Sequence, residues 1–279
     1  MGEQSVGVNG DGAVASAGSN VGIAFQGVGK AFGDVVALDG VTFEIDRHSR
    51  IGIVGPSGGG KSTLLQLTAG LLEQDVGTIN VEGETKTEGR LSRCAMMPQR
   101  DLLLPWRTAL DNAMIAIENR GVSKKEAREK TRPFFEHFGL AKFEDVRPDA
   151  LSGGMRQRVS FLRTLMAEKD ILLLDEPFGA LDAQTREIMQ DELLRIWLET
   201  RKTVLMVTHD VTEAVYLSNR ICVMSARPGQ IIEEFTVSLD RGRSREELVV
   251  SEQFNSIRNR VWLSVRRQAL AAGERNDES

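Results

Sequence analysis

The spacing of apolar residues predicts strands early in the chain and a helix directly after them. From about residue 21, the segments VGIAFQGV and VTFEI alternate apolar with polar residues, a pattern typical of half-buried strands. The run RIGIVG is shorter and more fully apolar, which suits a central strand covered on both faces. A helix is predicted to begin at Lys61, because KSTLLQLTAGLL places its leucines at helical spacing.

Two later regions differ in their periodicity. Between about 100 and 165, TALDNAMIAIENR and SKKEAREKTRPFFEHFGL follow a 3.6-residue period with charged outer faces, which predicts a helical subdomain. The strand-like runs that follow, DILLLDEP, TVLMVTH and RICVMS, alternate with the helical stretches DAQTREIMQDELLRIWLETR and DVTEAVYLSN. Strands that alternate with helices predict an α/β fold with a parallel sheet covered on its faces.

The two ends of the chain are predicted to differ from the middle. Residues 1–20 are rich in Gly, Ser, Ala and Asn and hold too little apolar surface to offset the entropy of ordering, so we expect a flexible tail. Residues 241–275 hold eight arginines against four glutamates, but their apolar residues share one helical face. We therefore expect a docked C-terminal helix with a solvated basic face, in preference to a nucleic-acid patch. The apolar face consists of Phe254, Ile257, Val261 and Val265.

Composition narrows the class of protein only a little. The 279 residues are 41% hydrophobic and 27% charged, enough for one large core or two small domains. Lys and Arg total 35 against 40 Asp and Glu, a net charge of −5, so nothing global favours nucleic acid or an anionic membrane. No apolar run approaches the roughly 20 residues that span a bilayer, and no secretory leader is recognisable. We expect a soluble chain, with Cys94 and Cys222 as buried thiols in a reducing compartment.

The segment GPSGGGKST satisfies the phosphate-loop pattern GxxxxGK[ST] between a predicted strand and a predicted helix. Its glycines let backbone N–H groups close around a β-phosphate, while Lys61 bridges β- and γ-oxygens and Ser62 binds Mg²⁺. A purely structural turn would have no reason to carry Lys-Ser at this offset. The residues of the loop are Gly55, Pro56, Ser57, Gly58, Gly59, Gly60, Lys61, Ser62 and Thr63.

Polar side chains end three further predicted strands. Asp175 and Glu176 follow the buried run ILLL, at the sheet edge where open α/β sheets bind ligands. We expect Asp175 to hold Mg²⁺ through water and Glu176 to polarise the attacking water; the alternative is a charge pair at a helix start. His209 follows TVLMV and is expected to donate to a γ-phosphate oxygen, and Gln99 follows RCAMM and is expected to bind Mg²⁺ or water. The other histidines, His48 and His137, are expected at the surface or in packing.

Two more segments pose alternatives. LSGGMRQR, at 151–158, looks like a second phosphate-binding helix start, although the chain already has a phosphate loop. The apolar cluster LLLPW, shortly after Gln99, is expected to be buried in the helical subdomain, with a groove for a partner helix as the alternative.

In order and spacing, GPSGGGKST, Gln99, LSGGMRQR, LLLDEPFGALD and VTHD resemble the ATP-binding subunits of ABC transporters over residues 21–235 or so. The resemblance implies a P-loop NTPase core with a mixed parallel sheet, an antiparallel β subdomain and an inserted α-helical subdomain. It implies a nucleotide-binding domain over 21–240 and a C-terminal helical extension over 241–279. Phe32 matches the aromatic residue that stacks on adenine in this family.

The resemblance also answers the question that the second glycine-rich segment raises. Two such subunits face each other head to tail, so Ser152, Gly153 and Gly154 would bind the ATP held by the phosphate loop of the partner, with Asp182 contributing. The implied protein is a Mg²⁺-dependent ATPase that forms a homodimer at the cytoplasmic face of the inner membrane. Its implied partners are transmembrane permease subunits and, indirectly, a substrate-binding protein, with no nucleic acid.

The narrower resemblance is to the nitrate, sulfonate and taurine importers, on phrases such as LLPWRTALDN, THDVTEAVYLSNR and SARPGQI. It predicts that the chain energises import of a small anion. Lipid, riboflavin or pyrimidine-precursor transport is the first alternative, and a soluble ABC ATPase that acts on DNA or ribosomes is the second. Three positions depart from the family pattern: Met155 replaces a commoner Gln, Gly179 a usual Ser, and His48 a usual turn glycine.

Overall fold

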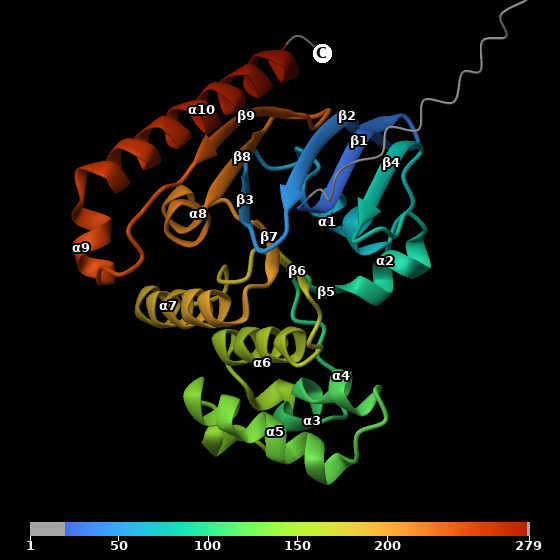
Figure 1. The fold of residues 1–279 in the computed structure, drawn as a ribbon, viewed down its shortest axis with the longest axis vertical. Helices are drawn as coiled ribbons and strands as arrows, with labels where there is room; N and C mark the ends of the chain where they lie inside the picture. Colours follow the sequence, from blue (N-terminus) through green and yellow to red (C-terminus); the bar gives the residue numbers. More distant parts are fainter. Residues whose placement is uncertain (1–19, 278–279) are drawn as a thin grey trace, which may run out of the picture.

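The chain folds around two sheets that lie next to each other (Figure 1). The computed structural model describes residues 20–277, with side chains described through residue 271. The predicted tail over residues 1–20 lies, apart from Asn20, outside the described residues. Among the residues that are described, no helix is both long and apolar enough to cross a membrane.

The larger sheet has six strands in the order β5-β6-β7-β3-β8-β9. Its first five strands are parallel, and β9 is antiparallel to β8. The strands are β3 (Arg50–Val54), β5 (Cys94–Met97), β6 (Ile171–Asp175), β7 (Thr203–Val207), β8 (Arg220–Met224) and β9 (Ile231–Thr236). Strands β6 and β7 are buried at every residue, and apart from Thr203 and Asp175 they consist of apolar residues.

The smaller sheet is antiparallel and has the order β2-β1-β4. Its strands are β1 (Val21–Phe32), β2 (Val35–Asp46) and β4 (Val76–Val81). One face of this sheet packs toward helix α1 (Lys61–Ala69), and the Phe25 and Phe43 rings stack there with centroids 4.5 Å apart. The alternation of apolar and polar residues in these strands follows from that one-sided burial.

Two hydrophobic cores lie on opposite faces of the six-stranded sheet. On β6, Leu173 belongs to the core shared with α1 and the smaller sheet, whereas Leu172 and Leu174 belong to the core beneath the other helices. The remaining helices are α2 (Thr87–Arg93), α3 (Ala109–Ala113), α4 (Ile115–Glu118), α5 (Lys124–His137), α6 (Gly153–Leu165), α7 (Ala183–Thr200), α8 (Val211–Leu217), α9 (Arg245–Val250) and α10 (Glu252–Asp277), with 3-10 turns at Ala141–Phe143 and Pro148–Ala150.

Figure 1 shows helices α3 to α6 at one end of the molecule, away from the antiparallel sheet, and α10 running along β8, β9 and α8. The predicted fold class is therefore confirmed. The predicted apolar face of α10 is also confirmed, because Phe254 and Val261 are fully buried and Ile257 and Val265 pack against the same core.

Two sequence predictions need correction or refinement. The cluster LLLPW is not buried as a unit: Leu103 is, but Leu102 is 60% exposed and Trp106 is 69% exposed, because the segment leaves β5 as an irregular surface loop. Cys222 is buried, whereas Cys94 is only partly covered. Burial raises the pKa of both thiols to about 12.

His48 stands where a turn glycine is usual in the family. Its backbone is left-handed, with φ 63°, which is the conformation that glycine adopts most easily and which explains the usual preference.

Candidate active site

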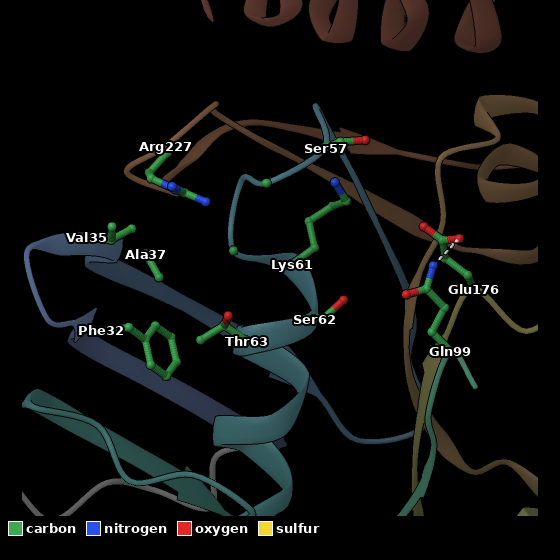
Figure 2. Close-up of a pocket in the computed structure, with 12 residues that line it drawn as sticks. Phe32, Val35, Ala37, Ser57, Lys61, Ser62, Thr63, Gln99, Glu176 and Arg227 are labelled. Carbon is green, nitrogen blue, oxygen red and sulfur yellow. Dashed lines mark hydrogen bonds between the residues drawn. The ribbon is translucent and has the colours of Figure 1, made fainter. Parts of the chain in front are cut away.

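A cavity of about 350 Å³ opens between the phosphate loop, the antiparallel sheet and the ends of β5 and β6 (Figure 2). Phe32 and Val35 line one end of it, and Gln99 and Glu176 line the other. The residues that line it are Phe32, Val35, Ala37, Ser57, Gly58, Gly60, Lys61, Ser62, Thr63, Gln99, Glu176 and Arg227.

The phosphate loop needs glycine for two separate reasons. Gly58 and Gly60 have left-handed backbones, with φ 76° and 81°. A Cβ atom on Gly60 would also lie 2.7 Å from the carbonyl oxygen of Ala37, and one on Gly59 would lie 2.5 Å from that of Ser225. The loop therefore holds its curled shape only with hydrogen at these positions.

Lys61 opens helix α1 and turns back over the loop. Its Nζ donates to the carbonyl oxygens of Gly55 (2.9 Å) and Pro56 (2.6 Å), and the residue is 8% exposed. Burial lowers the pKa of the Lys61 ammonium, and the carboxylates of Glu176 and Asp175 act against that shift. The ammonium is thus fixed inside the loop, where a phosphate oxygen would meet it.

Ser62 and Asp175 form the oxygen-rich corner of the site. The Ser62 hydroxyl donates to Asp175 Oδ1 at 3.1 Å, and Asp175 is 3% exposed. Burial raises the pKa of Asp175, and the bond from Ser62 opposes this. A hydroxyl and a buried carboxylate at the mouth of a phosphate loop are the donors that Mg²⁺ prefers, so the residues present fit that ion.

Glu176 stands at the turn after β6 with an unusual backbone. Its φ is 48°, a left-handed conformation that is strained for a residue with a side chain, and Pro177 follows it. The turn swings the carboxylate out of the line of the strand and into the cavity. There Oε2 accepts a hydrogen bond from Gln99 Nε2 at 3.1 Å and lies 3.4 Å from His209 Nδ1.

These contacts bring together three residues that the sequence placed at separate strand ends. Gln99 follows β5, Glu176 follows β6 and His209 follows β7, and the three strands are neighbours in the sheet. His209 keeps a largely exposed side chain, 67% accessible, so its ring can also reach a ligand. The prediction that all three lie at one sheet edge is confirmed.

The segment LSGGMRQR begins helix α6, and its first residues do not line the cavity of their own chain. Ser152 is exposed, and its hydroxyl accepts from the N–H of Met155 at 3.2 Å. Asp182 begins α7 in the same way, accepting from the N–H of Thr185. The residues that line the cavity do not include Ser152, Gly153, Gly154 or Asp182. Met155 packs against the core, which accounts for an apolar residue at that position.

Sequence reasoning missed two residues that belong to the site. Arg227 lines the cavity with its guanidinium near Gly58, but it comes from the loop between β8 and β9, far along the chain. Gln157 of α6 donates to the carbonyl oxygens of Glu176 (3.3 Å) and Pro177 (3.0 Å) and so braces the turn that carries Glu176. The one sequence signal for Arg227 is that it lies in SARPGQI, a segment that resembles the importer ATPases.

The family model described as ABC transporter matches residues 38–179 of the chain. The chain belongs to the ABC transporter family. It is 44% identical to an uncharacterized ABC transporter ATP-binding protein of Methanocaldococcus jannaschii, across 81% of this chain and 84% of that protein. As a member of this ATPase family, the chain binds and hydrolyses ATP.

Two importer subunits and one solved structure are also similar to this ABC ATPase. The nitrate import ATP-binding protein of Synechocystis sp. is 44% identical across 76% of this chain and 79% of its own length. The aliphatic sulfonates import ATP-binding protein of Bacillus cereus is 38% identical across 89% and 97%. The dimeric structure of a bacterial ABC transporter cassette superposes with a TM-score of 0.72 at 29% identity, covering 78% of this chain and all of that chain.

Proposed function

We propose that this ABC ATPase works as a homodimer that energises import of a small anion, of the nitrate, sulfonate or taurine type, through a membrane permease. The observation that carries the proposal is the split of the nucleotide-binding features. The phosphate loop and the ends of β5 and β6 line one cavity, and His209 at the end of β7 lies 3.4 Å from Glu176, whereas Ser152 lies exposed at a helix start outside the cavity. A partner's cavity is what that helix start would cover.

Within one site, each of the chain's own residues has a proposed task. Phe32 stacks on adenine, the loop from Gly55 to Thr63 binds the phosphates, and Lys61 bridges the β- and γ-oxygens. Bound Mg²⁺, held by Ser62, Gln99 and water on Asp175, would neutralise charge on the phosphates.

The chemical step depends on the cluster around Glu176. Its carboxylate takes a proton from the attacking water, and Gln99 orients the carboxylate through the bond to Oε2. His209, whose Nδ1 lies 3.4 Å from the same Glu176 oxygen, donates a hydrogen bond to the γ-phosphate. Ser152, Gly153, Gly154 and Asp182 of the partner close the site and exclude water.

Replacing Glu176 with Gln tests this assignment. The amide keeps the size of the side chain but cannot take a proton, so ATP binding should persist while turnover falls on the order of 10²- to 10⁴-fold. The ATP-bound variant should accumulate as a dimer in size-exclusion chromatography. Glu88→Gln, at an exposed carboxylate of α2, is the matched control and should behave as the wild type. Turnover near the wild-type rate in Glu176→Gln would remove Glu176 from this role.

The membrane partner is supported by the surface beside Gln99 and by the similarity to the nitrate and sulfonate import proteins. Leu102 and Trp106 expose large apolar side chains there, which suits contact with another protein. We expect the chain to copurify from membranes with permease subunits and its ATPase rate to rise with the transported anion. Copurification with ribosomes or DNA, and with no membrane subunit, would favour the soluble alternative. If a lipid or a vitamin raised the ATPase rate instead, the proposed transported substrate would be wrong, but the role in transport would stand.

A further inference from the structure

Helix α8 begins two residues after His209, and its first turn carries a carboxylate that the proposed mechanism does not use. Glu213 is 5% exposed, and its Oε2 accepts from Gln190 Nε2 of α7 at 3.1 Å. Among the described residues its other oxygen, Oε1, is buried and has no hydrogen-bond partner. A buried carboxyl group with one bond is costly, so its position calls for a physical reason.

A small cavity lies beside Glu213 and reaches the catalytic turn. Its volume is about 20 Å³, enough for one water molecule, and Glu176, Thr208 and His209 line it together with Glu213. Burial raises the pKa of Glu213 to about 7, and the Thr208 hydroxyl and, more weakly, Arg186 on the same cavity act against that shift. Glu213 thus shares a small cavity with Glu176 and His209.

The other side of Gln190 is held by the predicted C-terminal extension. Arg245 of α9 donates through Nη2 to Gln190 Oε1 at 2.7 Å and through Nη1 to Asp191 at 2.7 Å. Its side chain is 15% exposed, and its guanidinium carbon lies 4.2 Å from the centre of the Tyr216 ring. This arginine therefore sits in a built pocket between α7 and α8.

The orientation of the Gln190 amide follows from its two neighbours. The Arg245 guanidinium is always a donor and faces the amide oxygen, so the flipped amide would set its NH₂ group against a cation. The three side chains form a directional chain of hydrogen bonds: Arg245 donates to Gln190, and Gln190 donates to Glu213. Its two ends are the extension and the helix that follows His209.

Helix α8 is also fixed at its two ends. At its start, Asp210 caps the helix, and the Thr208 hydroxyl accepts from the N–H of Asp210 at 3.0 Å, on the other side of His209. At its end, Arg241 donates to the carbonyl oxygens of Tyr216 and Ser218. Local contacts thus fix the backbone on both sides of His209, and the helix that follows it is held by α7 through Glu213 and by the extension at its end.

We propose that Arg245 is a positioning residue for His209, acting through Gln190 and Glu213, so that the C-terminal extension sets the geometry of the γ-phosphate contact. The inference rests on the proposed role of His209. It gives the docked C-terminal extension a role in positioning the catalytic residues.

Replacing Arg245 with Met tests the inference, because Met keeps the apolar stem against Tyr216 but cannot donate. We expect kcat for ATP hydrolysis to fall about tenfold, the loss of a charge-assisted hydrogen bond felt in the transition state, with KM for ATP within about twofold of the wild type. The matched control is Arg267→Met, another arginine of the extension, whose exposed side chain reaches Glu233. The control should keep the wild-type kcat.

Two further measurements separate positioning from general damage to the fold. Gln190→Met breaks the same chain in the middle, so the double variant with Arg245→Met should lose no more activity than the worse single variant; additive losses would overturn the proposal. In ¹³C-histidine NMR spectra, Arg245→Met should shift the His209 ring signal and leave that of His48 unchanged. An unmoved His209 signal would also overturn it.

The two levels of the proposal fail differently. If His209→Ala hydrolyses ATP at the wild-type rate, the proposed role of His209 is wrong, whatever Arg245 does. If His209→Ala is inactive and Arg245→Met is as active as the control, the role of His209 stands and the brace from the extension is wrong.

Discussion

Helices α1 and α6 both start next to glycines, at the N-cap in α1 and in the first turn in α6, yet the two helix starts are built in opposite ways. At α1 the N-cap is Gly60, in a left-handed conformation and with no side-chain cap, so the first N–H groups of the helix have no acceptor from a capping side chain. At α6 the N-cap is Ser152, in an extended conformation, and its own hydroxyl accepts from the N–H of Met155.

The surroundings of the two helix starts differ as well. Gly60 packs against Leu38 and the Ala37 carbonyl group, whereas the nearest atom to a Cβ on Gly153 would be in the flexible Arg156 side chain, 3.9 Å away. The first helix start is thus enclosed and needs an anion to complete it. At the second helix start, the Ser152 hydroxyl already accepts from an N–H group of the first turn, and Ser152 is exposed at the surface. Glycine-rich helix starts therefore form an enclosed anion-binding loop at α1 and an exposed contact surface at α6.

The largest effect that would break this contrast is expected at Gly60. Gly60→Ala combines a left-handed backbone with a Cβ 2.6 Å from Leu38, so the loop must open, and we expect ATP affinity to fall at least about 100-fold. Equilibrium binding of a fluorescent ATP analogue measures this.

Two alanine variants serve as controls for that experiment. Gly121→Ala has the same φ of 81° with nothing within 4 Å, so it isolates the backbone strain and should lower the melting temperature while keeping ATP affinity. Gly153→Ala repeats the change at the α6 start and should leave ATP binding by the isolated subunit unchanged. Equal losses of affinity at Gly60 and Gly153 would contradict the contrast.

A smaller effect, a difference of one ATP site per dimer between two arrangements, is expected when Ser152→Arg is introduced into mixed dimers with Lys61→Ala. If Ser152 serves the partner's ATP, placing both changes on one subunit disables both sites, whereas placing them on opposite subunits spares one. Occluded ATP per dimer, measured with labelled nucleotide, should then be near zero in the first arrangement and near one in the second. The reverse result would mean that Ser152 serves its own chain.

Much of the site could be predicted from sequence because its residues follow short patterns at strand ends. A buried strand is mostly apolar, so the polar residues where its apolar run ends mark the sheet edge; Asp175, Glu176 and His209 were all located in that way. The helix at Lys61 was predicted correctly because its leucines and its glycine stop are local signals, and Gly70 indeed ends it in a left-handed conformation.

Contacts between distant segments could not be predicted in this way. Arg245 and Gln190 lie 55 positions apart and Gln190 and Glu213 lie 23 apart, and no periodicity links them. The exposure of Trp106 likewise depends on the path of a loop, since its apolar neighbours favour burial when read alone. Sequence patterns locate residues on elements, whereas packing between elements decides which of them meet.

The backbone of Glu176 has a consequence for selection experiments on this protein. A left-handed residue followed by proline costs the folded state on the order of 1 kcal/mol, and glycine at the same position would remove most of that cost. A library screened only for heat resistance should therefore enrich Glu176→Gly, a variant that should no longer hydrolyse ATP. At this residue, resistance to heat and turnover are competing traits.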